Sequence, residues 1–323
     1  MDKKVILRRS LTALFYVALA AALVIYLLNV DLSALATLSP SPVWLLVSVA
    51  LALGFRFWQV FVWLTVLRGL GAKDARMSPE LVEVYAKSWL GRYIPGTAPW
   101  ILGKIFFASQ YGISKARLAV GSLLEGVIQI AVLLALSSLM LLFDPRLDVL
   151  GQTLRIIMIV AIVGSIIALI PPVFNFGMSL LFRILRRGKL AAENRANGKT
   201  IIIASLQYVV GALLSGASLF FVVKAVYPEV DWADTTYVMA SSNLASASSM
   251  LAVFVPGGLG VREGVQLTLL SVVIPSAIAL VVVVFTRLWA IAMDLVFFAL
   301  GKVILAIARR RRGPEPEPAL PAE

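Results

Sequence analysis

Two glycine- and proline-rich segments carry the residues with the clearest chemical potential in this chain of 323 residues. The first contains Arg92, Pro95 and Gly96 and is followed by Lys104, and the second runs from Pro256 to Glu263. Proline lacks an amide hydrogen and glycine permits sharp turns, so both segments interrupt helices and leave backbone groups without helical partners. Amides at the start of a helix, beside arginine or lysine, attract anions. The sequence therefore predicts an anion-binding site shared by both segments, although such turns can also simply reverse the chain.

Ionisable residues also occur inside apolar stretches, where a charge at the bilayer centre costs on the order of 3 kcal/mol. The candidate substrate-binding residues of both kinds are Arg92, Pro95, Gly96, Lys104, Glu125, Pro256, Gly257, Gly258, Gly260, Arg262, Glu263 and Arg287, with Arg56, Asn243 and Asp294 as secondary candidates. Cations outnumber carboxylates in this set, which favours a phosphate-bearing substrate.

These charges predict a division of roles. Arg92, Lys104, Arg262 and Arg287 would neutralise phosphate, and a carboxylate of Glu125, Glu263 or Asp294 would pair with an amino group, a cation or a proton. The alternative is that the charges form interhelical pairs, such as Glu125 with Arg287, which only stabilise the bundle.

The composition places these residues in a membrane protein. Hydrophobic residues make up 60% of the chain and charged residues 14%, far from the balance of a water-soluble domain. The chain has no cysteine and no histidine, so thiolate chemistry and the commonest metal ligand are excluded. No metal site or cofactor is predicted, and no phosphate-binding loop or dinucleotide motif has the required spacing.

The apolar runs have the length of membrane-spanning helices, about 20 residues. They predict six spans, at about residues 11–30, 43–67, 118–143, 154–176, 201–226 and 277–307. The first run has an alternative interpretation as a cleaved signal peptide, because Ala34-Leu35-Ala36 fits a cleavage site. Segments 82–112 and 236–275 are not continuous apolar runs, and we expect each to be a broken re-entrant hairpin or two short spans.

Lysine and arginine cluster at one set of span ends. Residues 3–9, 183–199 and 309–312 are basic, whereas the intervening short loops are acidic or poor in cations. The positive-inside rule then predicts cytoplasmic amino and carboxyl termini. Residues 309–323, basic and then rich in proline and glutamate, are predicted to be a disordered cytoplasmic tail that contacts anionic lipids.

The two halves show the same order of spans and hairpin. A first repeat at 1–143 and a second at 144–308 would each hold three spans and one broken hairpin, in opposite orientations. A shift of about 161 residues places Pro95 on Pro256 and Lys104 near Arg262. The predicted fold is therefore an all-α polytopic membrane protein with two inverted repeats, a design that recurs in secondary transporters.

A hydroxyl-rich stretch lies within the second predicted hairpin. Ser242, Ser246 and Ser249 share one face of a helix that also contains Asn243. Small residues allow close helix packing and hydroxyls can line a polar groove, so both roles remain open.

Several of these motifs together resemble a known family. They are Arg92-Tyr93-Ile94-Pro95-Gly96, Gly103-Lys104, the segment from Tyr111 to Arg117, Leu123-Leu124-Glu125, and the segment from Pro256 to Gly264. They resemble the lysylphosphatidylglycerol synthase transmembrane region family, the flippase-like domain of the multiple peptide resistance factor. Gly126 departs from the expected arginine, which puts a local pair with Glu125 in doubt. The sequence resembles stand-alone members without the synthase domain, and the resemblance implies lipid translocation without lipid synthesis.

The sequence thus predicts a flippase, and not an enzyme, that moves an anionic or phosphate-bearing lipid between the leaflets of a prokaryotic cytoplasmic (inner) membrane. Aminoacyl-phosphatidylglycerol, another phospholipid and a polyprenyl-phosphate-linked sugar all fit. The alternatives are an accessory subunit of a lipid-modifying system and a membrane glycosyl or acyl transferase acting on a lipid carrier. Expected partners are the lipid substrate and anionic lipids, with no nucleic acid; a lipid-modifying enzyme and a second copy of the chain remain open.

Overall fold

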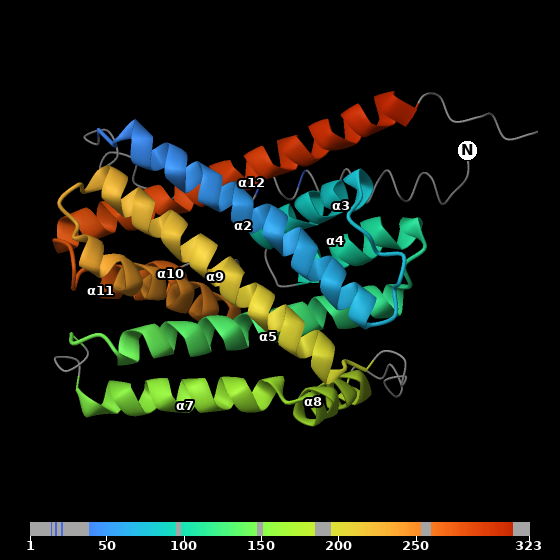
Figure 1. Ribbon diagram of the computed structural model, residues 1–323, viewed down its shortest axis with the longest axis horizontal. Coiled ribbons are helices and arrows are strands. Elements are labelled where there is room, and N and C mark those ends of the chain that lie inside the picture. Colours follow the sequence, from blue (N-terminus) through green and yellow to red (C-terminus); the bar gives the residue numbers. More distant parts are fainter. Residues whose placement is uncertain are drawn as a thin grey trace, which may run out of the picture.

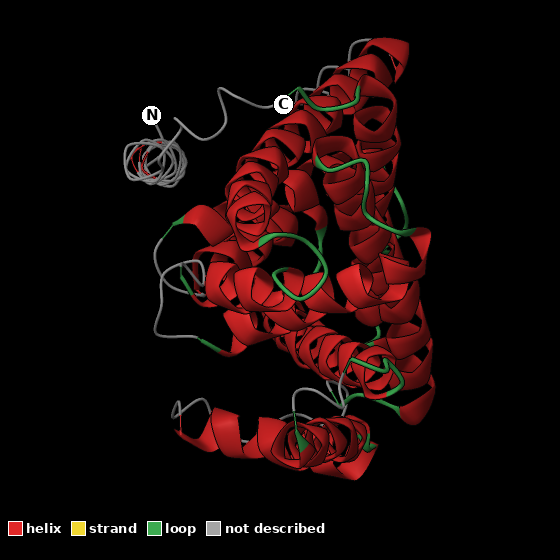
Figure 2. Ribbon diagram, turned by 90° about the vertical axis from the view of Figure 1, so that its left-hand side faces the viewer, coloured by secondary structure: helices red, strands yellow, loops and turns green. Residues whose placement is uncertain are grey.

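The computed structural model describes residues 39–94, 98–146, 151–184, 195–252 and 260–312, together with Leu14, Val17 and Ala21. Helices joined by short connections make up this part of the chain, and it contains no strand (Figure 2). The predicted all-α fold is therefore confirmed for these residues.

Long apolar helices form the frame of the molecule. Within the described ranges, five helices are long and apolar enough to cross a membrane: α2 (Pro42–Gly69), α5 (Lys115–Leu142), α7 (Gln152–Leu169), α9 (Gly198–Val226) and α12 (Ser276–Arg312). Four of the predicted spans are thus confirmed with similar bounds, as α2, α5, α9 and α12. The predicted span at 11–30 lies outside the described residues, except for Leu14, Val17 and Ala21.

The prediction of one continuous span at 154–176 is wrong. Helix α7 ends at Leu169, and a second helix, α8 (Pro171–Ile184), begins after a single residue. Ile170 adopts an extended conformation (φ −65°, ψ 123°), because a residue before proline is disfavoured in the helical region. Helix α7 buries only Met158 and Ser165 and forms an outer layer beside α5 (Figures 1 and 2).

The two segments predicted to be hairpins are pairs of short helices. The first pair is α3 (Pro79–Trp89), extended by the 3-10 turn η2 (Leu90–Tyr93), and α4 (Ala98–Ala108). The second pair is α10 (Thr235–Leu251) and α11 (Val261–Leu270). Helices of 11, 17 and 10 residues are shorter than the roughly 20 needed to cross the hydrocarbon core. The pairs lie toward opposite ends of the long axis of the molecule (Figure 1).

Local sequence explains how the first pair is formed. The Ser78 hydroxyl accepts a hydrogen bond from the Leu81 amide, and Pro79 occupies the first helical turn, so α3 begins at this point. Gly91 allows the two arms to meet, because a Cβ atom there would lie 2.8 Å from the Trp100 backbone nitrogen. A side chain at Gly91 would therefore push η2 away from α4.

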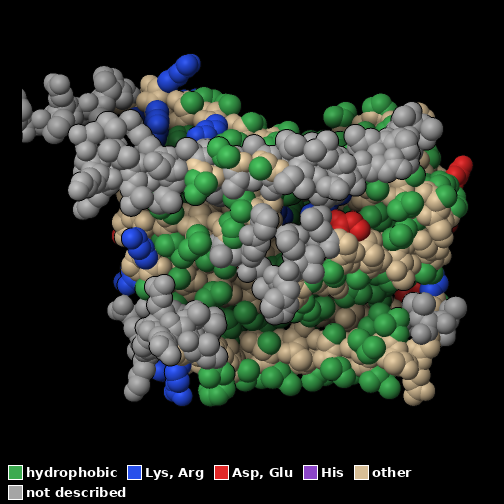
Figure 3. Space-filling view, turned by 180° about the vertical axis from the view of Figure 1, so that it is seen from behind, with side chains coloured by type: hydrophobic (Ala, Val, Ile, Leu, Met, Phe, Trp, Pro, Cys, Tyr) green, Lys and Arg blue, Asp and Glu red, His purple; other side chains and the backbone are tan. Residues whose placement is uncertain are grey.

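Ion pairs join α3 to the C-terminal turns of α12. Arg312 Nη1 lies 2.6 Å from Glu80 Oε1, and Lys302 Nζ lies 3.0 Å from Glu83 Oε1. On the face shown in Figure 3, apolar side chains cover much of the described surface, and most of the visible lysine and arginine side chains lie toward the edge where α12 ends. This distribution is typical of a protein whose middle band faces lipid.

Candidate functional site

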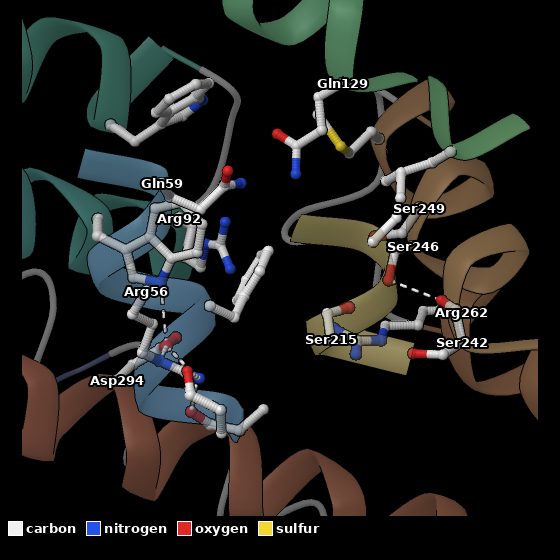
Figure 4. Close-up of a pocket in the computed structure, with 18 of the residues that line it drawn as sticks. Arg56, Gln59, Arg92, Gln129, Ser215, Ser242, Ser246, Ser249, Arg262 and Asp294 are labelled. Carbon is white, nitrogen blue, oxygen red and sulfur yellow. Dashed lines mark hydrogen bonds and ion pairs between the residues drawn. The ribbon is translucent and has the colours of Figure 1, made fainter. Parts of the chain in front are cut away.

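Both helix pairs reach one central cavity of about 430 Å³. Its described wall comes from α2, α3, η2, α4, α5, α9, α10, α11 and α12, while α7 and α8 contribute none of it. Tyr93, near the tip of the first pair, and Ala252, at the tip of the second, both line it. Residues of both predicted hairpins therefore line the same cavity, on opposite walls (Figure 4).

Asp294 on α12 is the centre of a hydrogen-bonded cluster at the edge of this cavity. Its Oδ1 accepts hydrogen bonds from Arg56 Nε at 2.6 Å and Trp89 Nε1 at 3.0 Å. Its Oδ2 accepts one from the Tyr93 hydroxyl at 2.6 Å. Arg56 also donates to the carbonyls of Ala52 and Ala290, so this carboxylate and its guanidinium are engaged within the protein. The cluster joins α2, α3, η2 and α12.

Lys104 and Glu125 form a second ion pair, which lies behind the cavity wall. Lys104 Nζ is 2.7 Å from Glu125 Oε2, and the two side chains are 0% and 2% exposed. The ammonium group also faces the rings of Tyr85 at 4.3 Å and Trp100 at 4.4 Å. Neither Lys104 nor Glu125 lines the cavity, so their predicted contact with substrate stays a prediction that the geometry does not support.

Replacing this pair together tests whether it has a structural role. We expect Lys104→Met/Glu125→Leu to change the free energy of unfolding by less than about 2 kcal/mol, because apolar residues often replace a buried ion pair at little cost. If the protein moves lipid, as the sequence predicts, the double variant should do so near the parent rate. Thermal unfolding and transport by the same purified protein would check both. A folded double variant that moves no lipid would instead give the pair a direct part in transport.

Glu263 and Arg287 are brought together at the start of α11. Glu263 Oε2 accepts a hydrogen bond from the Gly260 amide at 2.8 Å, and its Oε1 lies 3.5 Å from Arg287 Nε. Gly260 has φ +80°, a conformation that favours glycine, and Glu263 thereby caps the helix that follows. Arg287 lines the cavity, while Glu263 stands outside its wall.

Arg92 and Arg262 are different, because neither has a carboxylate partner among the described residues. Arg92 lies over the Trp89 ring, with its guanidinium carbon 3.6 Å from the ring centroid. Both line the cavity, and Figure 4 shows them on opposite walls, one from each helix pair. They supply an excess of positive charge facing the same space, as expected for an anion site.

Uncharged polar residues complete the wall. Ser242, Ser246 and Ser249 all line the cavity, which supports the polar-groove interpretation of the hydroxyl-rich stretch. Asn243 does not line it; this residue is 0% exposed, and its side-chain amide has no hydrogen-bond partner among the described residues.

Two glutamines in this wall were not among the residues predicted from the sequence. Gln59 on α2 is 1% exposed and neither polar atom of its amide is hydrogen-bonded, while Gln129 on α5 points its amide into the cavity (Figure 4). The available signal was an amide side chain within an apolar span, which is costly unless it finds a partner.

The remaining predicted residues cannot be compared with the structure. Pro95, Gly96, Pro256, Gly257 and Gly258 are outside the described residues. No group of histidine, cysteine, aspartate and glutamate that could hold a metal ion occurs in the described part of the chain. The prediction that the site uses no metal or cofactor is not tested further by the structure.

The sequence comparisons agree with the helical architecture. The model of the family described as lysylphosphatidylglycerol synthase TM region matches residues 12–313. Searches of curated proteins and of solved structures returned no match. With its long apolar helices, the chain is a multi-pass membrane protein, and its family points to a lipid-related function. The chain belongs to the lysylphosphatidylglycerol synthase TM region family.

Proposed function

We propose that the protein is a lipid translocase that moves an anionic or phosphate-bearing lipid between membrane leaflets. The observation that carries this proposal is the pair of guanidinium groups, Arg92 and Arg262, which face one cavity from different helix pairs and make no ion pair with a carboxylate of the described residues. A lipid phosphate between them would receive charge-assisted hydrogen bonds from both. No covalent bond changes in this function, so the protein acts as a carrier and not as an enzyme.

The arrangement of helices supports a path across the membrane. In the proposal, α3–α4 and α10–α11 are re-entrant hairpins that enter from opposite faces and belong to two inverted repeats. A headgroup bound between their tips would be near the middle of the bilayer while its acyl or prenyl tails stay among the lipids. Inverted-repeat transporters place their sites between the repeats in this way.

The proposed orientation follows from the charged ends. Lys302 and the arginines at 309–312 lie in the C-terminal part of α12. The acidic residues Asp144 and Asp234 lie in connecting segments, Asp144 just after α5 and Asp234 just before α10. The positive-inside rule assigns the basic end to the cytoplasmic side of the membrane, which we propose is a prokaryotic cytoplasmic membrane. Anionic headgroups at that surface would contact the basic end of α12.

Reconstitution tests the proposal directly. The full chain would be placed in liposomes containing a fluorescent acyl-labelled phosphatidylglycerol, and a membrane-impermeant quencher would report the fraction accessible from outside. Protein-dependent exchange between leaflets is the expected result. If folded protein moves neither this lipid nor a labelled polyprenyl-phosphate hexose, with or without a pH gradient, the translocase proposal fails and the accessory-subunit and transferase alternatives gain support.

Gly126 offers a way to narrow the cavity without disturbing the fold. It lies in the wall, and a Cβ atom at this position would meet no heavy atom within 4 Å. We expect Gly126→Leu to slow lipid movement by about fivefold through occupying space, with unchanged thermal stability, since open space removes the usual cost of overpacking. Gly177→Leu is the matched control, because Gly177 on α8 is exposed, has the same open surroundings and lies outside the wall. Equal rates of lipid movement by Gly126→Leu and Gly177→Leu would mean that the lipid does not pass through this cavity.

A further inference from the structure

We infer that the cavity selects a headgroup that combines a phosphate with hydroxyl groups and carries no ammonium group. This inference deepens the proposed function and depends on it for the route by which a lipid reaches the cavity. It commits to the headgroup chemistry shared by phosphatidylglycerol and a polyprenyl-phosphate sugar. It excludes a lysyl-bearing headgroup as the preferred substrate.

The first argument is that the carboxylates near the cavity are already engaged. Asp294 is the one carboxylate in its described wall, and it accepts hydrogen bonds from Arg56, Trp89 and Tyr93. Glu125 is paired with Lys104, and Glu263 is held by the Gly260 amide and Arg287. An incoming ammonium group would therefore have to displace one of the protein's own cations to gain a carboxylate partner.

The residues at the tips do not alter this account. Residues 95–97 are Pro-Gly-Thr and residues 253–259 are Val-Phe-Val-Pro-Gly-Gly-Leu, so neither segment contains an aspartate or a glutamate. Whatever their positions, these segments add no negative charge to the cavity. Among the described residues, the wall holds four arginines and one carboxylate.

Positive charge remains in the cavity wall after the ion pairs of the described residues are counted. In the described part of the chain, Arg92 and Arg262 line the cavity without forming an ion pair, and Arg287 lines it as well. Like charges repel most strongly where water is scarce, because the effective dielectric constant is low. A cationic lysyl group beside these guanidinium groups would lose its hydration without gaining an opposite charge, while a phosphate would gain two.

The third argument is the supply of neutral hydrogen-bonding groups. The buried amide of Gln59 and the hydroxyl of Ser122 line the cavity and have no partner among the described residues. Ser242, Ser249 and Gln129 add further hydroxyl and amide groups to the wall (Figure 4). Hydroxyls and amides both donate and accept, so they match the hydroxyls of a glycerol or a sugar. Unsatisfied buried polar groups of this kind are costly unless a ligand or water completes them.

Competition binding tests the selectivity without requiring transport. Detergent-purified full chain would be offered equimolar phosphatidylglycerol, lysyl-phosphatidylglycerol and a short-chain polyprenyl-phosphate hexose, and bound lipid would be measured by native mass spectrometry. We expect at least one of the two lipids that lack an ammonium group to exceed lysyl-phosphatidylglycerol by about tenfold, a difference of about 1.4 kcal/mol. Which of them binds more tightly identifies the source of the headgroup.

The outcomes separate this inference from the proposed function. Equal or preferential binding of lysyl-phosphatidylglycerol, or no binding of any of these lipids by folded protein, overturns the inference. Selective binding without movement in liposomes supports the inference about the cavity and removes the translocase proposal. If lysyl-phosphatidylglycerol moves as fast as phosphatidylglycerol, the translocase proposal stands and the inferred selectivity of the cavity is overturned.

A charge added to the wall provides a gain-of-function test. Gln129→Glu installs a carboxylate of nearly the same shape in the cavity, and we expect the ratio of bound lysyl-phosphatidylglycerol to phosphatidylglycerol to rise about tenfold. Gln152→Glu makes the same chemical change at an exposed position on α7 and should leave the ratio unchanged. The same ratio in both variants would contradict the charge account of selectivity.

Discussion

Replacing Arg262 with glutamine is expected to slow lipid translocation by about 100-fold, equivalent to about 2.7 kcal/mol, the scale of hydrogen bonds to a charged group. Arg262 lines the cavity and makes no ion pair among the described residues, so its removal breaks no described structural contact. Thermal stability should therefore stay near the parent value. The measurement is leaflet exchange of labelled phosphatidylglycerol in liposomes with matched protein content.

Two companion variants make this result specific. Arg76→Gln removes an exposed arginine distant from the cavity wall and should retain parent activity. Arg262→Lys keeps the charge but loses the planar fork that grips two phosphate oxygens, so an intermediate rate of about one tenth is expected. A rate for Arg262→Gln equal to that for Arg76→Gln would remove Arg262 from the binding site.

Of the variants proposed, Asp294→Ala is expected to lower the free energy of unfolding most, by about 3–5 kcal/mol. Breaking a buried ion pair leaves the remaining charge without compensation. The variant would leave Arg56, Trp89 and Tyr93 without the acceptor that they share. Those donors come from α2, α3 and η2, so the first helix pair would lose one of its attachments to α12, while the ion pairs of Glu80 and Glu83 with the last turns of α12 would remain. Thermal unfolding in detergent and the yield of monodisperse protein would measure the loss.

A double replacement shows whether charge or connectivity causes this loss. Arg56→Met/Asp294→Leu removes both charges and should recover more than half of the lost stability, because no buried charge is left alone. Stability of the double variant no better than that of Asp294→Ala would place the energy in the hydrogen bonds from Trp89 and Tyr93. Parent-like stability of Asp294→Ala itself would contradict the role assigned to the cluster.

A helix could be predicted from the sequence where the length of its apolar run alone defines it. Apolar length alone located α2, α5, α9 and α12 to within a few residues, except where α12 continues through its arginines to Arg312. The break between α7 and α8 was missed because hydrophobicity continues across it. Pro171-Pro172 was the available signal, and it outweighs the apolar pattern because proline constrains the backbone directly.

The sequence predicted the kinds of residue in the site, but it did not predict which cation pairs with which carboxylate. A surplus of cations could be counted from the sequence, and Arg92 and Arg262 do line the cavity. Which carboxylate each cation meets depends on tertiary packing, since Asp294 is 238 residues from Arg56 and Glu125 is 21 residues from Lys104. The roles of Gln59 and Gln129 were hidden because a neutral amide shows its function only through its surroundings.

Arg92 and Arg262, which form no ion pair among the described residues, would also make the stability of the protein depend on the membrane around it. A ligand that binds only the folded state adds to folding stability by mass action, and a bound anion would relieve the desolvated charges of Arg92 and Arg262. Folding and substrate occupancy are then thermodynamically linked. If the proposed function holds, the lipid composition of the host membrane would help to set how long the folded protein survives there.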